Sequence, residues 1–166
     1  MKYAEEYLEM IDELPGIGRR SAERILAETG IQMKQFRNAD HFASWAGLVP
    51  QCNESAGKKK STRLRKGNQY LKATIVECAR SAIRNKKSYY YAKYCKIAAR
   101  RGGKRALVAV AHSMMIAIYH MVKKKSRFCD LGSEYFNKLN EDRIKNRNIN
   151  TLKKLGYDVT LTPLTS

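Results

Sequence analysis

The chain has 166 residues, with 33 Lys and Arg against 15 Asp and Glu, a formal net charge of +18 at pH 7. Charge of one sign repels itself unless a polyanion is near, so nucleic acid is the expected partner. Hydrophobic residues make up 43% of the chain, which is enough for a folded core. No run approaches the roughly 20 apolar residues that span a bilayer, and the N-terminus lacks an apolar signal-peptide core. We therefore expect a cytoplasmic protein with no membrane partner.

The positive charge is concentrated in the middle of the chain. Residues 1–54 carry six basic and nine acidic side chains, residues 55–129 carry 21 and one, and residues 130–166 carry six and five. We expect a polyanion to bind the middle segment. The four cysteines, at positions 52, 78, 95 and 129, form no C-x-x-C pair and have no histidine at ligand spacing. The sequence therefore predicts neither a disulfide framework nor a metal or cofactor site in this chain.

Apolar periodicity predicts helices along most of the chain. A first helix ends near Glu13, the connection 14–18 follows, and a second helix runs over 19–29 and stops at Gly30. Asn38 or Asp40 caps a short helix that ends at Trp45. Residues 51–67 have no apolar period and are rich in Lys, Ser and Gly, which predicts an exposed basic loop with room for a short hairpin.

Three more helices are predicted after this loop. Asn68 begins one with a strong apolar stripe, Ser88 caps another that continues to Arg101, and a third runs over 104–124. Residues 133–155 predict one polar helix, followed by a tail. The expected fold is mostly α: a helix over 1–13 that leads in from a preceding domain, a compact helical domain over 14–127, and a polar helical extension over 128–166.

The segment 11–29 has the form of a helix-hairpin-helix. Gly16 and Gly18 allow a tight turn with exposed N–H groups at the positive end of the following helix, and Arg19 and Arg20 flank that turn. Such a turn can bind a DNA phosphate without reading the base. The alternative is an ordinary connection between two helices, in which Pro and Gly serve geometry alone.

The basic loop contains a candidate nucleophile, Ser55, between small residues. Its cations could bind phosphates and stabilise the charge that develops on a phosphate under attack; they are Lys58, Lys59, Lys60, Arg63, Arg65 and Lys66. No histidine lies in this segment to remove the serine proton. By composition alone Ser55 is therefore better explained as a loop hydroxyl or a phosphate contact than as a nucleophile.

Several blocks, in this order, resemble the C-terminal half of the insertion sequence 110/116/902 transposases. They are L-P-G-I-G-x-x-S-A-x-x-I-L-A-E-x-G from Leu14, F-A-S-W-A-G-L-V-P from Phe42, N-x-S-x-G-K from Asn53, R-x-x-K-G-N-x-Y-L-K from Arg63, and R-R-G-G-K-R-A from Arg100. The resemblance covers about residues 11–126. In the family's loop pattern V-P-x-x-N-S-S-G-G-K, the second serine falls on Ser55, while Glu54 and Ala56 replace the first serine and the first glycine.

This resemblance implies a helical domain whose nucleophilic serine, Ser55, works with an N-terminal ribonuclease-H-like domain that holds a divalent metal such as Mg²⁺. It also implies DNA as the substrate, a structured guide RNA, a homo-oligomeric enzyme, and association with the bacterial nucleoid. Without the acidic domain this chain is expected to be inactive alone. The alternative is a non-catalytic helix-hairpin-helix module that binds DNA or RNA; the tyrosines at 89–91 and 94 could then stack on bases or contribute to the core.

Overall fold

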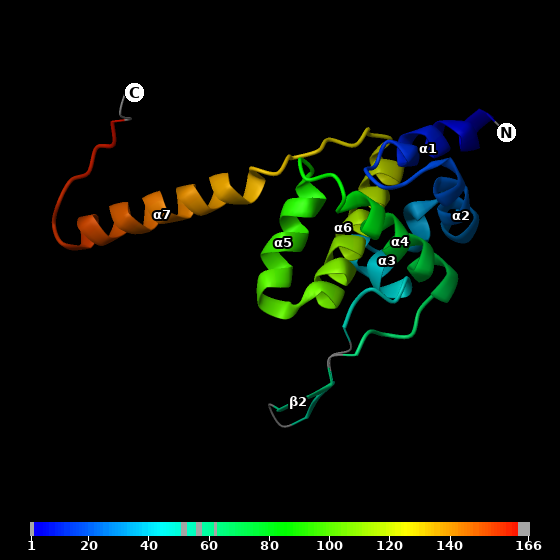
Figure 1. Cartoon of the computed structure of the whole chain (residues 1–166), viewed down its shortest axis with the longest axis horizontal. Coiled ribbons are helices and arrows are strands. Elements are labelled where there is room, and N and C mark those ends of the chain that lie inside the picture. Colours follow the sequence, from blue (N-terminus) through cyan, green and yellow to red (C-terminus); the bar gives the residue numbers. More distant parts are fainter. Residues whose placement is uncertain (1, 51–52, 56–57, 62, 163–166) are drawn as a thin grey trace. The chain divides into compact units, whose positions relative to one another are not determined.

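The computed structural model describes residues 2–50, 53–55, 58–61 and 63–162. It divides into two compact units, Met1–Ser133 and Glu134–Ser166. The helices of the first unit are α1 (Lys2–Asp12), α2 (Arg19–Thr29), the 3-10 turn η1 (Met33–Gln35), α3 (Ala39–Trp45), α4 (Gln69–Ala82), α5 (Tyr89–Arg101) and α6 (Gly103–Lys124). The strands β1 (Asn53–Ser55) and β2 (Lys58–Ser61) lie between α3 and α4 (Figure 1). The prediction of a mostly helical fold is confirmed.

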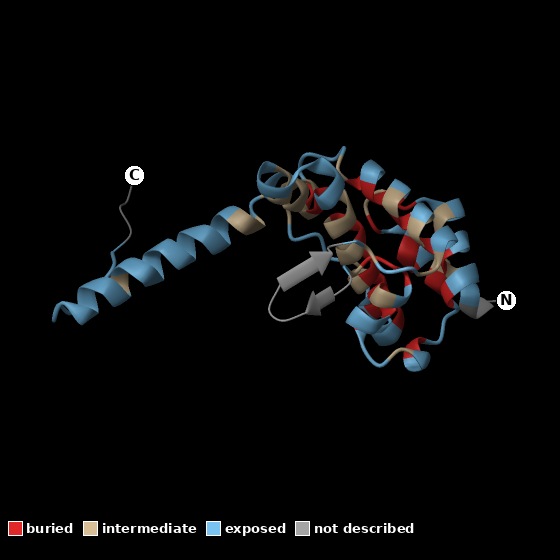
Figure 2. Ribbon diagram, turned by 90° about the horizontal axis from the view of Figure 1, so that it is seen from below, coloured by how far each residue is buried: buried red, intermediate tan, exposed pale blue. Residues whose placement is uncertain are grey.

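Helix α6 is the centre of the first unit. It packs against α1, α3, α4 and α5, and buried residues line the interior between these helices (Figure 2). Its buried side chains are Ala106, Val110, Ala111, Met114, Met115, Ile118, Tyr119, Met121 and Val122. Among the described residues α6 is also the one helix long and apolar enough to cross a membrane. Burial among four other helices accounts for that composition.

Three helices begin at side-chain caps that the sequence predicts. Asn38 accepts a hydrogen bond from the backbone N–H of His41, Asn68 from that of Leu71, and Ser88 from that of Tyr91. Of the two candidates for α3, Asn38 is thus the cap. Each such bond satisfies a backbone donor that the helix leaves unpaired, which stabilises the fold by about 1 kcal/mol.

The tyrosine run at the start of α5 contributes to the core. The side chain of Tyr90 is only 1% exposed, and its ring stacks on Phe128, with 5.8 Å between the ring centroids. Tyr89 packs partly against the same core. The sequence left two interpretations of this run open, base stacking and a contribution to the core. For Tyr89 and Tyr90 the structure shows the contribution to the core.

Two titratable side chains lie half-buried where α5 packs on α6. Lys93 donates a hydrogen bond to Ser113, and burial lowers the pKa of Lys93. His112 lies beside Ser113 in the chain. Burial, together with the charge of Lys93, lowers the pKa of His112, while Asp40 opposes that shift.

The shift of His112 predicts that the protein loses stability as the pH falls below 6.5, the ordinary pKa of this group. Below that pH the unfolded chain binds a proton that folded His112 resists, so protonation favours unfolding. The melting temperature should fall between pH 7.5 and 5.5, and less steeply in His112→Gln than in the wild type. His120→Gln, at an exposed position of α6, is the matched control. An equal pH dependence in both variants would contradict this assignment.

The second unit consists of α7 (Tyr135–Lys154) and the segment that follows it. None of the residues of α7 is buried, and Leu139, Ile144 and Leu152 are exposed. The polar helix predicted over 133–155 is thus present, and within the described residues it has no buried core of its own.

Candidate nucleic-acid interface

Between α3 and α4, the described residues of segment 48–66 (48–50, 53–55, 58–61 and 63–66) pair as an antiparallel ribbon. Near α3 and α4, the N–H of Arg65 donates to the carbonyl of Val49 (N···O 3.1 Å), and Pro50 pairs with Leu64. Farther out, the register pairs Asn53 with Ser61, Glu54 with Lys59, and Ser55 with Lys58. Among the described elements β1 and β2 contact each other and no helix. The ribbon therefore projects from the helices (Figure 1).

Two glycines fix the root of this ribbon. A Cβ atom on Gly67 would lie 2.4 Å from the backbone nitrogen of Gly47 and 2.6 Å from the carbonyl oxygen of Trp45, so no larger residue fits. Gly47 itself has φ +74°, which favours glycine. The N–H of Asn68 also donates to the carbonyl of Trp45 (3.2 Å). The two legs thus meet backbone to backbone, where α3 ends and α4 begins.

The predicted nucleophile and the first three predicted cations lie at the tip of the ribbon. Ser55 is the last residue of β1, and Lys58, Lys59 and Lys60 belong to β2. The register places the backbone of Ser55 directly opposite that of Lys58. Residues 56–57, which join the strands, lie outside the described residues.

The remaining predicted cations follow on the second leg. Arg63, Arg65 and Lys66 are all exposed, and Arg65 donates from its guanidinium to the hydroxyl of Ser44 (3.4 Å). No Asp or Glu occurs between residues 55 and 76. The ribbon thus has six basic side chains against one acid, Glu54, and this net positive charge attracts a polyanion over long range.

The turn between α1 and α2 packs against α4. Gly16 has φ +87°, and a Cβ atom there would lie 2.4 Å from both the backbone nitrogen of Ala82 and the carbonyl oxygen of Cys78. Gly16 is thus required by close packing as well as by its backbone conformation. This contact favours, for Gly16, the interpretation in which the glycine serves the geometry of an ordinary connection between two helices.

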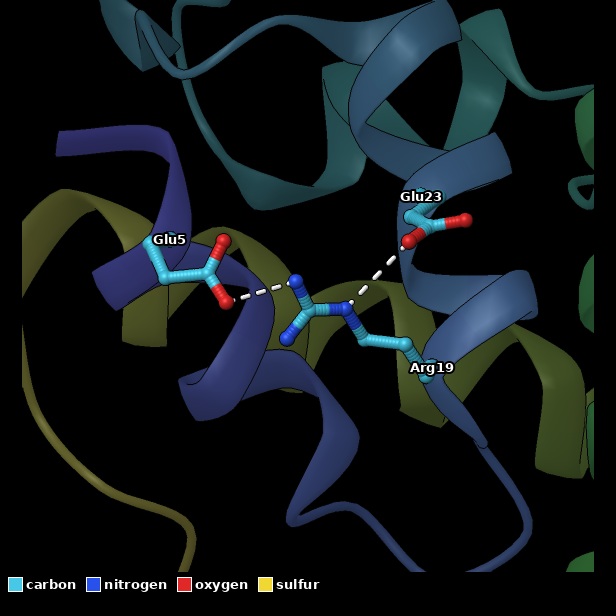
Figure 3. Close-up of polar contacts among 3 residues, drawn as sticks. All are labelled: Glu5, Arg19 and Glu23. Carbon is cyan, nitrogen blue, oxygen red and sulfur yellow. Dashed lines mark hydrogen bonds and ion pairs between the residues drawn. The ribbon is translucent and has the colours of Figure 1, made fainter. Parts of the chain in front are cut away.

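Arg19 is held by two carboxylates. Its guanidinium lies 2.6 Å from Glu5 and 3.3 Å from Glu23, as Figure 3 shows. The hydrogen bond to Glu5 contributes most to raising the pKa of Arg19, so the group stays charged but is already compensated. Gly18 and Arg20 are exposed, and a Cβ atom on Gly18 would meet nothing within 4 Å. Phosphate binding by this turn stays a prediction, with Gly18 and Arg20 accessible for it.

The amino-acid sequence matches a known protein family. The family model described as "Transposase IS116/IS110/IS902 family" matches residues 8–96, which is more than half of the chain. The chain belongs to this family. A relative from Pseudomonas aeruginosa PAO1, described as a probable family 20 transposase, is 36% identical over 70 residues. That match covers 42% of this chain and 20% of the relative, so the chain matches about a fifth of the relative's length.

In this member of the IS116/IS110/IS902 transposase family, the matched residues include the α1–α2 turn, the ribbon and α4. Among the described residues, no three His, Cys, Asp or Glu side chains gather closely enough to hold a metal ion. Of the cysteines, Cys78 is buried, whereas Cys95 and Cys129 are exposed free thiols. Cys52 lies outside the described residues.

Sequence reasoning missed one feature of this transposase domain, an open depression at the root of the ribbon. We call it the aromatic depression; it is lined by Trp45, Lys66, Gly67, Asn68, Gln69 and Tyr70. Trp45 packs against Phe36 and Phe42, yet the residue is 39% exposed. Tyr70, at 79%, is exposed still more. The signal that could have found Tyr70 is its place off the apolar stripe of α4.

Proposed function

We propose that this chain is the serine-bearing domain of a DNA transposase and that Ser55 is its nucleophile. The hydroxyl oxygen attacks a phosphorus atom of DNA, the bond from phosphorus to a deoxyribose oxygen breaks, and the strand is held as a phosphoserine ester. The serine hydroxyl loses its proton as it attacks and the departing deoxyribose oxygen gains one, so the protons balance. Lys58, Lys59 and Lys60, nearest Ser55 in the register, stabilise the negative charge of the transition state, and Arg63, Arg65 and Lys66, nearer the root, bind phosphates farther along the strand.

The backbone register of the ribbon is the single observation that carries this proposal. It sets the backbone of Ser55 opposite that of Lys58, at the head of three consecutive lysines, on strands β1 and β2, which contact no helix among the described elements. A serine whose backbone pairs with the first residue of a lysine run, on strands that contact no helix among those elements, suits attack on a polyanionic strand. Family membership supports the same class of substrate.

The rigid root supports the proposal from the other end of the ribbon. The Gly47–Gly67 contact and the Asn68–Trp45 hydrogen bond tie the ribbon to two helices. A nucleophile works best when its supporting residues are themselves fixed. A ribbon that is anchored at one end can place its tip at a defined distance from the helical body.

Metal chemistry is assigned to other residues of the enzyme. Mg²⁺ takes carboxylate oxygens as ligands, and residues 55–129 contain a single acid, Glu77. We therefore propose that acidic residues of a ribonuclease-H-like domain hold the metal ion. A structured guide RNA and a homo-oligomer stay predictions from the resemblance.

DNA binding through the ribbon can be tested by salt dependence. Replacing Lys58, Lys59 and Lys60 together with Gln should lower the slope of log K against log[salt] by about 2.7, if each lysine neutralises one phosphate of duplex DNA. At 0.1 M salt the affinity should fall on the order of 100-fold. Fluorescence anisotropy of a labelled duplex measures both.

The chain supplies a matched control in its second run of three lysines. Lys123, Lys124 and Lys125 are exposed at the end of α6, where Lys125 lies over the ring of Tyr7 of α1 (5.8 Å to the ring centroid). Their replacement with Gln removes the same charge but should leave the slope nearly unchanged. Equal losses in the two triple variants would mean that only net charge matters and would refute binding through the ribbon.

A further inference from the structure

We infer that the aromatic depression binds an unpaired base of a DNA strand that runs along the ribbon. This inference rests on the proposed function and adds a second contact to it, a base contact in place of a phosphate contact. It assigns Trp45 and Tyr70 as the stacking residues. Ser55 does not line this depression, and Lys66, which does, is assigned a phosphate and not the base.

Exposure of two aromatic rings at one depression is the first evidence. Tyr70 is the most exposed of the large hydrophobic side chains in the described part of the chain. Both rings line the same depression as Lys66. Aromatic faces beside cations are the usual means by which proteins hold unpaired bases, because every base has a face that stacks.

The fixed position of Trp45 is the second observation. Its ring lies 5.4 Å from that of Phe36 and 6.4 Å from that of Phe42, measured between ring centroids, and it is nearly parallel to Phe42. Part of the indole is thus packed into the core while part faces the depression. A ring that is already immobilised loses little conformational entropy when a base stacks on it.

The polar residues of the depression divide into structural and accessible ones. The side chain of Asn68 accepts from the N–H of Leu71 and donates to the carboxylate of Glu28, so it is occupied by the fold. Lys66 and Gln69 are exposed. Lys66 offers a charge to the neighbouring phosphate, and the amide of Gln69 offers both a donor and an acceptor to a base edge.

The register of the ribbon sets where this base lies in the strand. The depression is at the root, where Lys66 follows the Pro50–Leu64 pair, whereas Ser55 pairs with Lys58 at the far end of β1 and β2. A base in the depression is therefore not the base next to the bond that is attacked.

Trp45 is the single tryptophan of the chain, so its fluorescence reports on the depression directly. The probes are a 12-nucleotide thymidine strand and an abasic strand with the same number of phosphates. The thymidine strand should quench Trp45 and bind more tightly, whereas the abasic strand should bind through its phosphates with little quenching. Tyr70→Ala should weaken thymidine-strand binding about 5- to 150-fold, the equivalent of one stacked base, and leave abasic-strand binding unchanged.

Two further variants separate stacking from a general surface effect. Tyr70→Phe keeps the ring and should bind the thymidine strand as the wild type does. Tyr157→Ala removes a tyrosine that is 64% exposed in the other unit and should have no effect. Tighter binding of the matching RNA strand than of the DNA strand would overturn the assignment to DNA.

Failure of this inference differs from failure of the proposed function. If both strands bind with equal affinity and equal quenching, or bind without any quenching, the base site is refuted while phosphate binding by the ribbon stands. If neither strand binds, as judged by the anisotropy of an end label, the proposed function is refuted together with the base site.

Discussion

Replacing Ser55 with alanine is expected to reduce DNA strand exchange to background, on the order of a 10³-fold loss or more, because no phosphoserine ester can form without the hydroxyl. The assay uses an enzyme reconstituted by joining this chain to an acidic, metal-binding domain of the family. Exchange between two labelled duplexes is measured at saturating DNA. Binding of the same duplex should be unchanged, because the phosphate-binding cations remain.

Ser61→Ala is the matched control for this variant. Ser61 is the last residue of β2 and pairs with Asn53, so it lies in the same ribbon. The proposed mechanism gives it no chemical role, and Ser61→Ala should retain strand exchange. Exchange that persists in Ser55→Ala would refute the nucleophile and leave a non-catalytic DNA-binding module.

Replacing Gly16 with alanine should destabilise the fold by about 3 kcal/mol or more, the largest stability effect that we expect from one methyl group. The backbone φ of +87° is unfavourable for alanine, and the new methyl would lie 2.4 Å from two backbone atoms of α4. Backbone atoms within a helix cannot move aside as a flexible side chain can. Urea denaturation followed by circular dichroism measures the loss.

Gly30→Ala separates the two causes of destabilisation, the backbone strain and the clash with α4. Gly30 has φ +64°, but a Cβ atom there would meet no heavy atom within 4 Å. With ψ −177° as well, Gly30 has a backbone conformation that is open essentially to glycine alone, so this variant should cost only the conformational strain, about 2 kcal/mol. Equal destabilisation by the two substitutions would show that packing of the turn against α4 contributes nothing.

The helices could be predicted from the sequence because their signals are local. The spacing of Leu71, Ile75 and Cys78 marks one buried face of α4. Asn68 and Ser88 cap the helices that they precede for the same local reason, since their side chains bond to an N–H three residues away. Signals within one or two helical turns need no knowledge of the rest of the fold.

The features that the sequence could not predict depend on long-range contacts. The bond from Arg19 to Glu5 joins residues 14 positions apart, and it compensates a charge that sequence reasoning assigned to a phosphate. The Gly47–Gly67 contact closes a ribbon between residues 20 positions apart. The exposure of Trp45 depends on which part of its ring Phe36 and Phe42 cover, and no pattern along the chain reports that.

The candidate site was predictable in part. The concentration of cations after residue 55 is visible in the sequence, because it is a matter of composition. The pairing of Ser55 with Lys58 depends on the strand register, which the composition of a basic loop does not specify. The role of Ser55 as the nucleophile rests on the resemblance and stays a prediction.

Mapping the covalent adduct tests the central proposal most directly. The reconstituted enzyme would be incubated with a nicked DNA substrate that traps the phosphoserine ester, then digested and analysed by tandem mass spectrometry. We predict a single adduct, a nucleotide attached to the peptide that contains Ser55, and none in Ser55→Ala. An adduct on any other residue, or strand exchange without an adduct at Ser55, would contradict the proposal.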